Sequence, residues 1–163
     1  MAKLTSKLIV MAALLAAAGC TKSHPDVLPP SPGGDVDHGG GVVPGSREDF
    51  LQSVVSDTIH FAYDKYDVDQ RSRQILDSQA EWLAKYPNVN VTIEGHCDER
   101  GTREYNLALG DRRANAAANY LAGKGVVPAR ITTISYGKER PIALGSDEAS
   151  YAQNRRAVTI VLQ

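Results

Sequence analysis

The fold of this chain is decided by the segment Gly95-His96-Cys97-Asp98-Glu99-Arg100-Gly101-Thr102-Arg103-Glu104-Tyr105-Asn106-Leu107-Ala108-Leu109-Gly110-Asp111-Arg112-Arg113-Ala114. An alternating apolar run, typical of a strand, ends at the first of these residues, and a polar loop follows. A helix is predicted from Glu104. Within it, Asn106 and Arg113 lie seven residues apart, close to two helical turns, so they share one edge of the helix.

That edge borders the apolar stripe of the helix, so Arg113 is expected to be partly sheltered from solvent. A sheltered guanidinium needs a partner. Asp98, at the start of the polar loop, could supply it as a structural salt bridge, and the carboxylate of a ligand could supply it equally well in chemical terms. Taken without any family resemblance, the sequence favours the salt bridge.

Strands and helices alternate on both sides of this segment. Strands are predicted over residues 57–61, 88–95, 131–136 and 157–162, and helices over residues 46–54, 69–86, 104–124 and 147–155. Ser46 resembles the start of a capping box, and Pro87 ends the second helix. The order β-α-β-α-β-(α)-β predicts one α+β domain, over residues 46–163, in which helices cover a mixed four-stranded sheet as a two-layer sandwich.

Three motifs, in the family's order, resemble those of the OmpA C-terminal-like family. They are Phe61-Ala62-Tyr63-Asp64, the segment from Gly95 to Ala114, and Asn154-Arg155-Arg156-Ala157. Tyr63 stands where the family usually has Phe. The tail Ser135-Tyr136-Gly137-Lys138-Glu139-Arg140-Pro141 is similar to that of one branch of this family, the peptidoglycan-associated lipoproteins.

The resemblance implies a site for diaminopimelate, a residue of the peptidoglycan stem peptide. Asp98 would pair with the ammonium at the side-chain end of diaminopimelate, and Arg113 would pair with the carboxylate there. It implies no cofactor, no metal and no catalytic residue. Tyr63 could equally do no more than cover the edge of the core. The other ligand-binding residues that the resemblance implies are Tyr63, Asp64, Asn106, Leu109 and Arg155.

The N-terminal region predicts a secreted and lipid-anchored protein. The apolar run over residues 8–18 has the length of a signal-peptide core and is too short to span a bilayer. Small residues then precede Cys20, which resembles a bacterial lipobox, although Ala17 stands where Leu is usual. Residues 1–19 are thus a predicted signal peptide, Cys20 a predicted lipidation site, and the Pro- and Gly-rich residues 20–45 a disordered tether. An ordinary signal peptide with an incidental cysteine is the alternative.

Other functional classes find little support in the sequence. The formal net charge of −1 is not that of a nucleic-acid-binding protein. Neighbouring residues of a strand point to opposite faces, so His96 and Cys97 do not form a metal site by themselves. Cys97 is the one cysteine besides Cys20, and a thiol-dependent cell-wall hydrolase is the alternative function that it raises.

The predicted function is therefore that of a lipoprotein of the outer membrane, facing the periplasm, which binds peptidoglycan non-covalently and tethers the membrane to the cell wall. The outer-membrane location is implied by the resemblance. The resemblance also implies a TolB-like periplasmic partner, within a Tol–Pal system that acts in envelope integrity and cell division.

Overall fold

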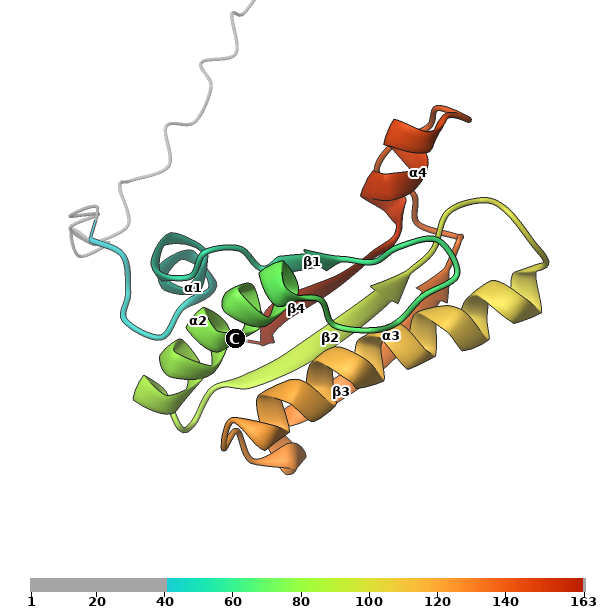
Figure 1. Cartoon of the computed structure of the whole chain (residues 1–163). Helices are drawn as coiled ribbons and strands as arrows, with labels where there is room; N and C mark the ends of the chain where they lie inside the picture. The colour runs from blue at the N-terminus through green and yellow to red at the C-terminus, as the bar shows by residue number, and fades with distance from the viewer. Residues whose placement is uncertain (1–40, 163) are drawn as a thin grey trace, which may run out of the picture. The chain divides into compact units, whose positions relative to one another are not determined.

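The computed structural model describes residues 41 to 162. The predicted signal peptide, the predicted lipidation site at Cys20 and most of the predicted tether lie outside these residues. None of the helices in the described part of the chain is long and apolar enough to cross a membrane. The elements in chain order (Figure 1) are α1 (Arg47–Ser53), β1 (Thr58–His60), α2 (Gln70–Lys85), β2 (Asn90–His96), α3 (Arg103–Gly123), the 3-10 helix η1 (Pro128–Arg130), β3 (Ile131–Gly137), α4 (Glu148–Asn154) and β4 (Arg156–Leu162).

The four strands form one mixed sheet in the order β1-β4-β2-β3, which confirms the predicted fold class. The strand β4 runs antiparallel to both of its neighbours, β1 and β2, and β2 runs parallel to β3. The parallel pairing shifts register between Gly95 and His96, at the end of β2 where the polar loop begins. Such an irregularity redirects the side chains that follow it.

The helices α2 and α3 lie beside each other on one face of the sheet (Figure 1). Val91 and Ile93 of β2 point into the layer between sheet and helices, where they meet Leu76 of α2 and Leu121 of α3. At the site end of α3 the packing is tighter still. Gly110 lies directly against Gly95 of β2, and neither position has room for a Cβ. This close approach brings the start of α3 down onto the end of β2.

Polar side chains cap the first turns of the helices. The side chain of Asp69 accepts a hydrogen bond from the backbone N–H of Ser72, and Thr102 does the same for Tyr105 at the start of α3. At α1, Ser46 caps the helix as predicted, but Asp49 accepts from the backbone N–H of Gly45 instead of closing the box on Ser46. The last residues of the predicted tether, 43–45, thus form a turn that joins α1.

Candidate ligand-binding site

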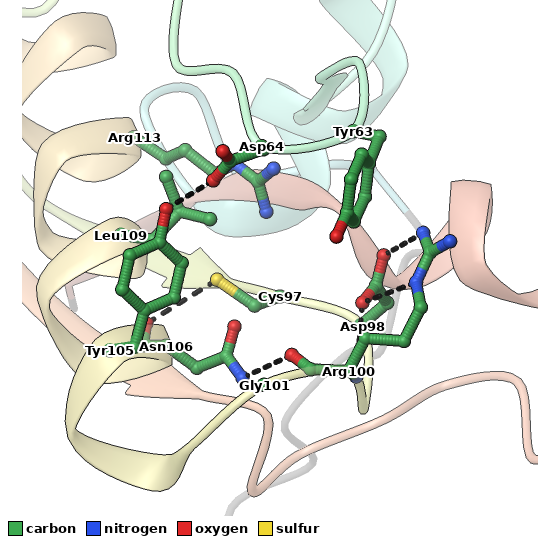
Figure 2. A pocket seen from close by; sticks show the side chains of 10 residues that line it. All are labelled: Tyr63, Asp64, Cys97, Asp98, Arg100, Gly101, Tyr105, Asn106, Leu109 and Arg113. Atoms are coloured by element: carbon green, nitrogen blue, oxygen red, sulfur yellow. Dashed lines mark hydrogen bonds and ion pairs between the residues drawn. The ribbon is translucent and has the colours of Figure 1, made fainter.

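A small pocket lies at one end of the sheet, where the loops after β1 and β2 meet the start of α3 (Figure 2). Its volume of ≈ 60 Å³ is well below the roughly 300 Å³ at which pockets for whole small molecules begin. It therefore suits the end of one extended side chain. The lining residues are Tyr63, Asp64, Cys97, Asp98, Arg100, Gly101, Tyr105, Asn106, Leu109 and Arg113.

Arg113 is fully buried, and its partners differ from those that the sequence suggests. Its Nε donates to the carbonyl oxygen of Lys65 at 2.8 Å, Nη1 to that of His96 at 2.8 Å, and Nη2 to that of Ala62 at 3.2 Å. The salt bridge between Arg113 and Asp98, the alternative to ligand binding, is absent from the ion pairs of residues 41 to 162. Burial lowers the pKa of Arg113, because the carbonyls supply dipoles and no full negative charge.

The carbonyl contacts give Arg113 a structural role. They join α3 to the loop after β1 and to the end of β2, which are the walls of the pocket. A guanidinium has five N–H groups, and three are used here, so two remain. Figure 2 shows the guanidinium directed toward the interior of the pocket, where a carboxylate could accept from those two.

Asp98 is buried on the other side of the pocket and is paired with two arginines. Its Oδ2 lies 2.6 Å from Nη2 of Arg100 and 3.3 Å from Nη1 of Arg155, and its Oδ1 accepts from the backbone N–H and from Nε of Arg100. Burial alone would raise the pKa of Asp98. The hydrogen bonds from Arg100 and Arg155 outweigh burial and hold that pKa below its ordinary value.

Arg155, which was expected to be near the ligand, lies behind Asp98 and is not among the residues that line the pocket. Its Nε donates to the carbonyl oxygen of Phe61 at 3.0 Å and its Nη2 to Glu148 at 2.7 Å. The side chain is 7% exposed. Arg155 therefore positions the Asp98 carboxylate and joins β4 to the loop after β1.

The other predicted residues line the same pocket, each with its own contacts. Asn106 donates from Nδ2 to the carbonyl oxygens of Arg100 and Thr102, so it holds the loop after β2. Leu109 is buried and forms an apolar wall. Tyr63 is exposed at the rim, and Asp64 beside it has a φ of 57°, in the left-handed region that few residues other than glycine adopt.

Four lining residues are not among the predicted ligand-binding residues: Cys97, Arg100, Gly101 and Tyr105. The guanidinium of Arg100 lies between two aromatic rings, 4.1 Å from the centroid of Tyr63 and 4.3 Å from that of Tyr151. The hydroxyl of Tyr105 donates to Asp64 across the mouth of the pocket. The only sequence signal for Arg100 is its place two residues after Asp98. The only signal for Tyr105 is its place in the first turn of α3, one position before Asn106.

Cys97 is a buried side chain whose S–H donates to the carbonyl oxygen of Asn106 at 3.3 Å. Burial raises the pKa of the thiol, which is the opposite of what a nucleophilic cysteine requires. Among residues 41 to 162, no group of three or more His, Cys, Asp or Glu side chains is placed to hold a metal ion.

Comparisons with known proteins agree with this architecture. The model of the OmpA family matches residues 60–155. The chain is 49% identical over 154 residues to a peptidoglycan-associated lipoprotein of Rhizobium meliloti, covering 94% of this chain and 86% of that protein. It is 44% identical over 158 residues to one of Haemophilus influenzae, covering 97% of this chain and 98% of that protein.

A solved structure shows the same fold. The crystal structure of the peptidoglycan-associated lipoprotein from Burkholderia pseudomallei is 42% identical in sequence and superimposes with a TM-score of 0.66, covering 70% of this chain and all of that one. The C-terminal domain of Helicobacter pylori MotB shares the fold at 22% identity, with a TM-score of 0.60 over 66% of this chain and 84% of that one. The chain belongs to the OmpA family, and within it to the peptidoglycan-associated lipoproteins.

Proposed function

We propose that this protein binds peptidoglycan non-covalently through the diaminopimelate of the stem peptide and so attaches the outer membrane to the cell wall. The observation that carries the proposal is that Asp98 and Arg113 lie on opposite walls of one pocket, which suits the end of one side chain. That end of diaminopimelate carries an ammonium and a carboxylate. The ammonium is assigned to Asp98 and the carboxylate to the two unused N–H groups of Arg113.

Sedimentation with purified diaminopimelate-type sacculi tests this assignment. The protein used is residues 21–163, the chain after the predicted lipidation site. Asp98→Asn keeps the shape of the side chain and removes its charge, and Asp111→Asn changes an exposed carboxylate on α3 as a matched control. The wild type and Asp111→Asn are expected to pellet with the sacculi, and Asp98→Asn to bind at least about tenfold more weakly. A folded Asp98→Asn variant that pellets like the wild type would contradict the proposal.

The chemistry of the wall provides a second arm. Sacculi with lysine in place of diaminopimelate lack the carboxylate that we assign to Arg113, yet they keep the ammonium. Binding to them is expected to be weaker than to diaminopimelate-type sacculi. Equal binding to both walls would contradict the role of Arg113 in recognition. The sacculi should also release no soluble fragments, since the raised pKa of Cys97 speaks against a thiol-dependent hydrolase.

The membrane attachment and the protein partner are further parts of the proposal. Lipid on Cys20 would anchor the chain to the outer membrane with the domain on the periplasmic side, and labelling of cells with palmitate should mark the wild type and leave Cys20→Ser unmarked. A TolB-like protein is the proposed partner, within a Tol–Pal system active in cell division. Repeated pull-downs from envelope extracts that recover no such protein would argue against it.

A further inference from the structure

The Asp98 carboxylate has no free acceptor position in this structure. A carboxylate offers about four lone-pair positions. Arg100 fills three of them, from its backbone N–H at 3.1 Å, Nε at 3.2 Å and Nη2 at 2.6 Å, and Arg155 fills the fourth at 3.3 Å. A ligand ammonium that binds Asp98 must therefore displace one of these donors.

Arg155 is the harder of the two guanidinium groups to displace. Its side chain is 7% exposed, and its other nitrogen atoms donate to Phe61 and Glu148. Moving it would leave a buried carbonyl oxygen without a donor. The Arg100 side chain is 34% exposed and lies at the pocket mouth, with Asp98 between it and the interior (Figure 2).

Arg100 already has a second set of contacts. Its Nη1 lies 3.6 Å from Oε2 of Glu148, which is exposed, and its guanidinium packs between the rings of Tyr63 and Tyr151. A small rotation away from Asp98 would leave the guanidinium between the rings and strengthen the pair with Glu148. The side chain can thus leave Asp98 without losing all its partners.

We propose that Arg100 is an internal cation that occupies Asp98 in the free protein, and that the ligand ammonium takes its place while Arg100 turns to Glu148. This inference rests on the proposed function. It makes Arg100 a specificity-determining residue. A stem peptide with a free, positively charged ammonium can replace Arg100 at Asp98. A peptide whose amine is acetylated carries no charge there and cannot displace Arg100 from the ion pair.

Calorimetric titration of residues 21–163 tests the inference. The probes are a stem peptide that ends in diaminopimelate and the same peptide acetylated on the side-chain amine. Arg100→Met removes the competing charge and keeps an apolar stem between the two rings. It is expected to bind the unmodified peptide about tenfold more tightly than the wild type, with less than about a twofold change for the acetylated peptide.

Three further variants distinguish competition for Asp98 from simple support of the loop. Glu148→Gln keeps an acceptor for Arg155 and removes the charge that receives Arg100, so it should weaken peptide binding in the wild type. In the Arg100→Met background, the same change should have no effect. Arg100→Lys keeps the competing charge and should bind the peptide within about threefold of the wild type.

The outcomes distinguish this inference from the proposed function. If Arg100→Met binds the unmodified peptide with unchanged or weaker affinity while Asp98→Asn loses binding, Arg100 does not compete and the inference is wrong, although the site stands. If Asp98→Asn binds like the wild type, the proposed function itself is wrong.

Discussion

Gly95 of β2 and Gly110 of α3 lie in direct contact, with no side chain between strand and helix. A Cβ on Gly95 would overlap the carbonyl oxygen of Gly110, and a Cβ on Gly110 would overlap Oγ of Ser135 and come within 3.0 Å of the Gly95 carbonyl oxygen. The atoms that a Cβ on Gly95 would meet all belong to the backbone of Gly110, so no flexible side chain can move aside. The contact therefore sets the distance between helix and strand at the end of the sheet that carries the site.

Alanine at these glycines is expected to destabilise the domain. Gly95→Ala should lower the free energy of unfolding by about 3 kcal/mol, because backbone must move to make room for the methyl group. Gly123→Ala is the control, since a Cβ at Gly123, the last residue of α3, meets nothing within 4 Å. That change should be neutral or stabilising by up to about 1 kcal/mol. Urea unfolding followed by the fluorescence of Trp82, the only tryptophan, measures both, and equal losses would refute the steric argument.

Arg113 is predicted to matter for stability before any ligand is present. Arg113→Met should cost about 3 kcal/mol, because three carbonyl oxygens lose the guanidinium donor together, while that of Ala62 keeps another, the backbone N–H of Lys65. Arg112→Met, the neighbouring exposed arginine on α3, should change stability by less than about 0.5 kcal/mol. Urea unfolding of both variants checks this. Equal stability of the two would show that Arg113 is free to serve the ligand alone. Loss of binding in an Arg113 variant must accordingly be judged beside its stability.

Because His96 is buried, the domain is expected to lose stability in mild acid. The residue is 1% exposed, its ring stacks on Tyr136, and neither ring nitrogen has a hydrogen-bond partner among the described residues. Burial, together with the charges of Arg156 and Arg140, lowers the pKa of His96 to about 4, while Glu94 lies 3.6 Å from its Nε2. Between pH 6.5 and 4, only the unfolded chain binds the proton. Stability is therefore full above pH 6.5 and falls as the pH is lowered, by about 3 kcal/mol at most.

Urea unfolding at a series of pH values tests this. In His96→Phe the decline between pH 6.5 and 4 should be smaller than in the wild type. The pKa of His60 is also lowered, by partial burial and by Arg156, so it adds to the decline in both proteins and cancels in the comparison. Parallel curves for the two proteins would remove His96 as the cause.

Asp64 is predicted to contribute to binding more than to stability. Asparagine tolerates the left-handed backbone and still accepts from the hydroxyl of Tyr105, so Asp64→Asn should change the free energy of unfolding by less than about 0.5 kcal/mol. The lost charge at the pocket should weaken binding to sacculi about threefold. Asp67→Asn, an exposed carboxylate of the same loop that does not line the pocket, should bind like the wild type. Asp64 would have no role if the two variants bound alike.

The sequence predicted the elements well because their signals are local. Asp69 begins α2 through its own side chain, and the alternation around Val91 marks β2. The order of the strands could not be predicted, because nothing in or near residues 156–162 indicates that this strand lies between β1 and β2. The 3-10 helix Pro128–Arg130 was also missed, as a single turn leaves little periodicity.

The same holds for the site: some of its residues could be predicted from the sequence, but their contacts could not. Asp98 and Arg113 could be placed in one site through a family motif, but their partners could not. The carbonyl oxygens that bind Arg113 belong to the backbone, which every residue has, so no residue type marks them. From the sequence alone, Arg100 in a polar loop is indistinguishable from an arginine exposed to solvent. Its role depends on Tyr63 and Tyr151, which are distant in the sequence and come near only in the folded domain.

The position of β4 has a consequence for how this protein is made. The strand is the last of the described elements, yet it lies between β1 and β2 and carries Arg156 and the residues that follow it into the middle of the sheet. During synthesis, β1 and β2 have no shared neighbour until residues 156–162 emerge, and each leaves an unpaired edge open to aggregation or proteolysis. A chain cut short by these seven residues would lack one of the two interior strands of the sheet and could not complete this fold.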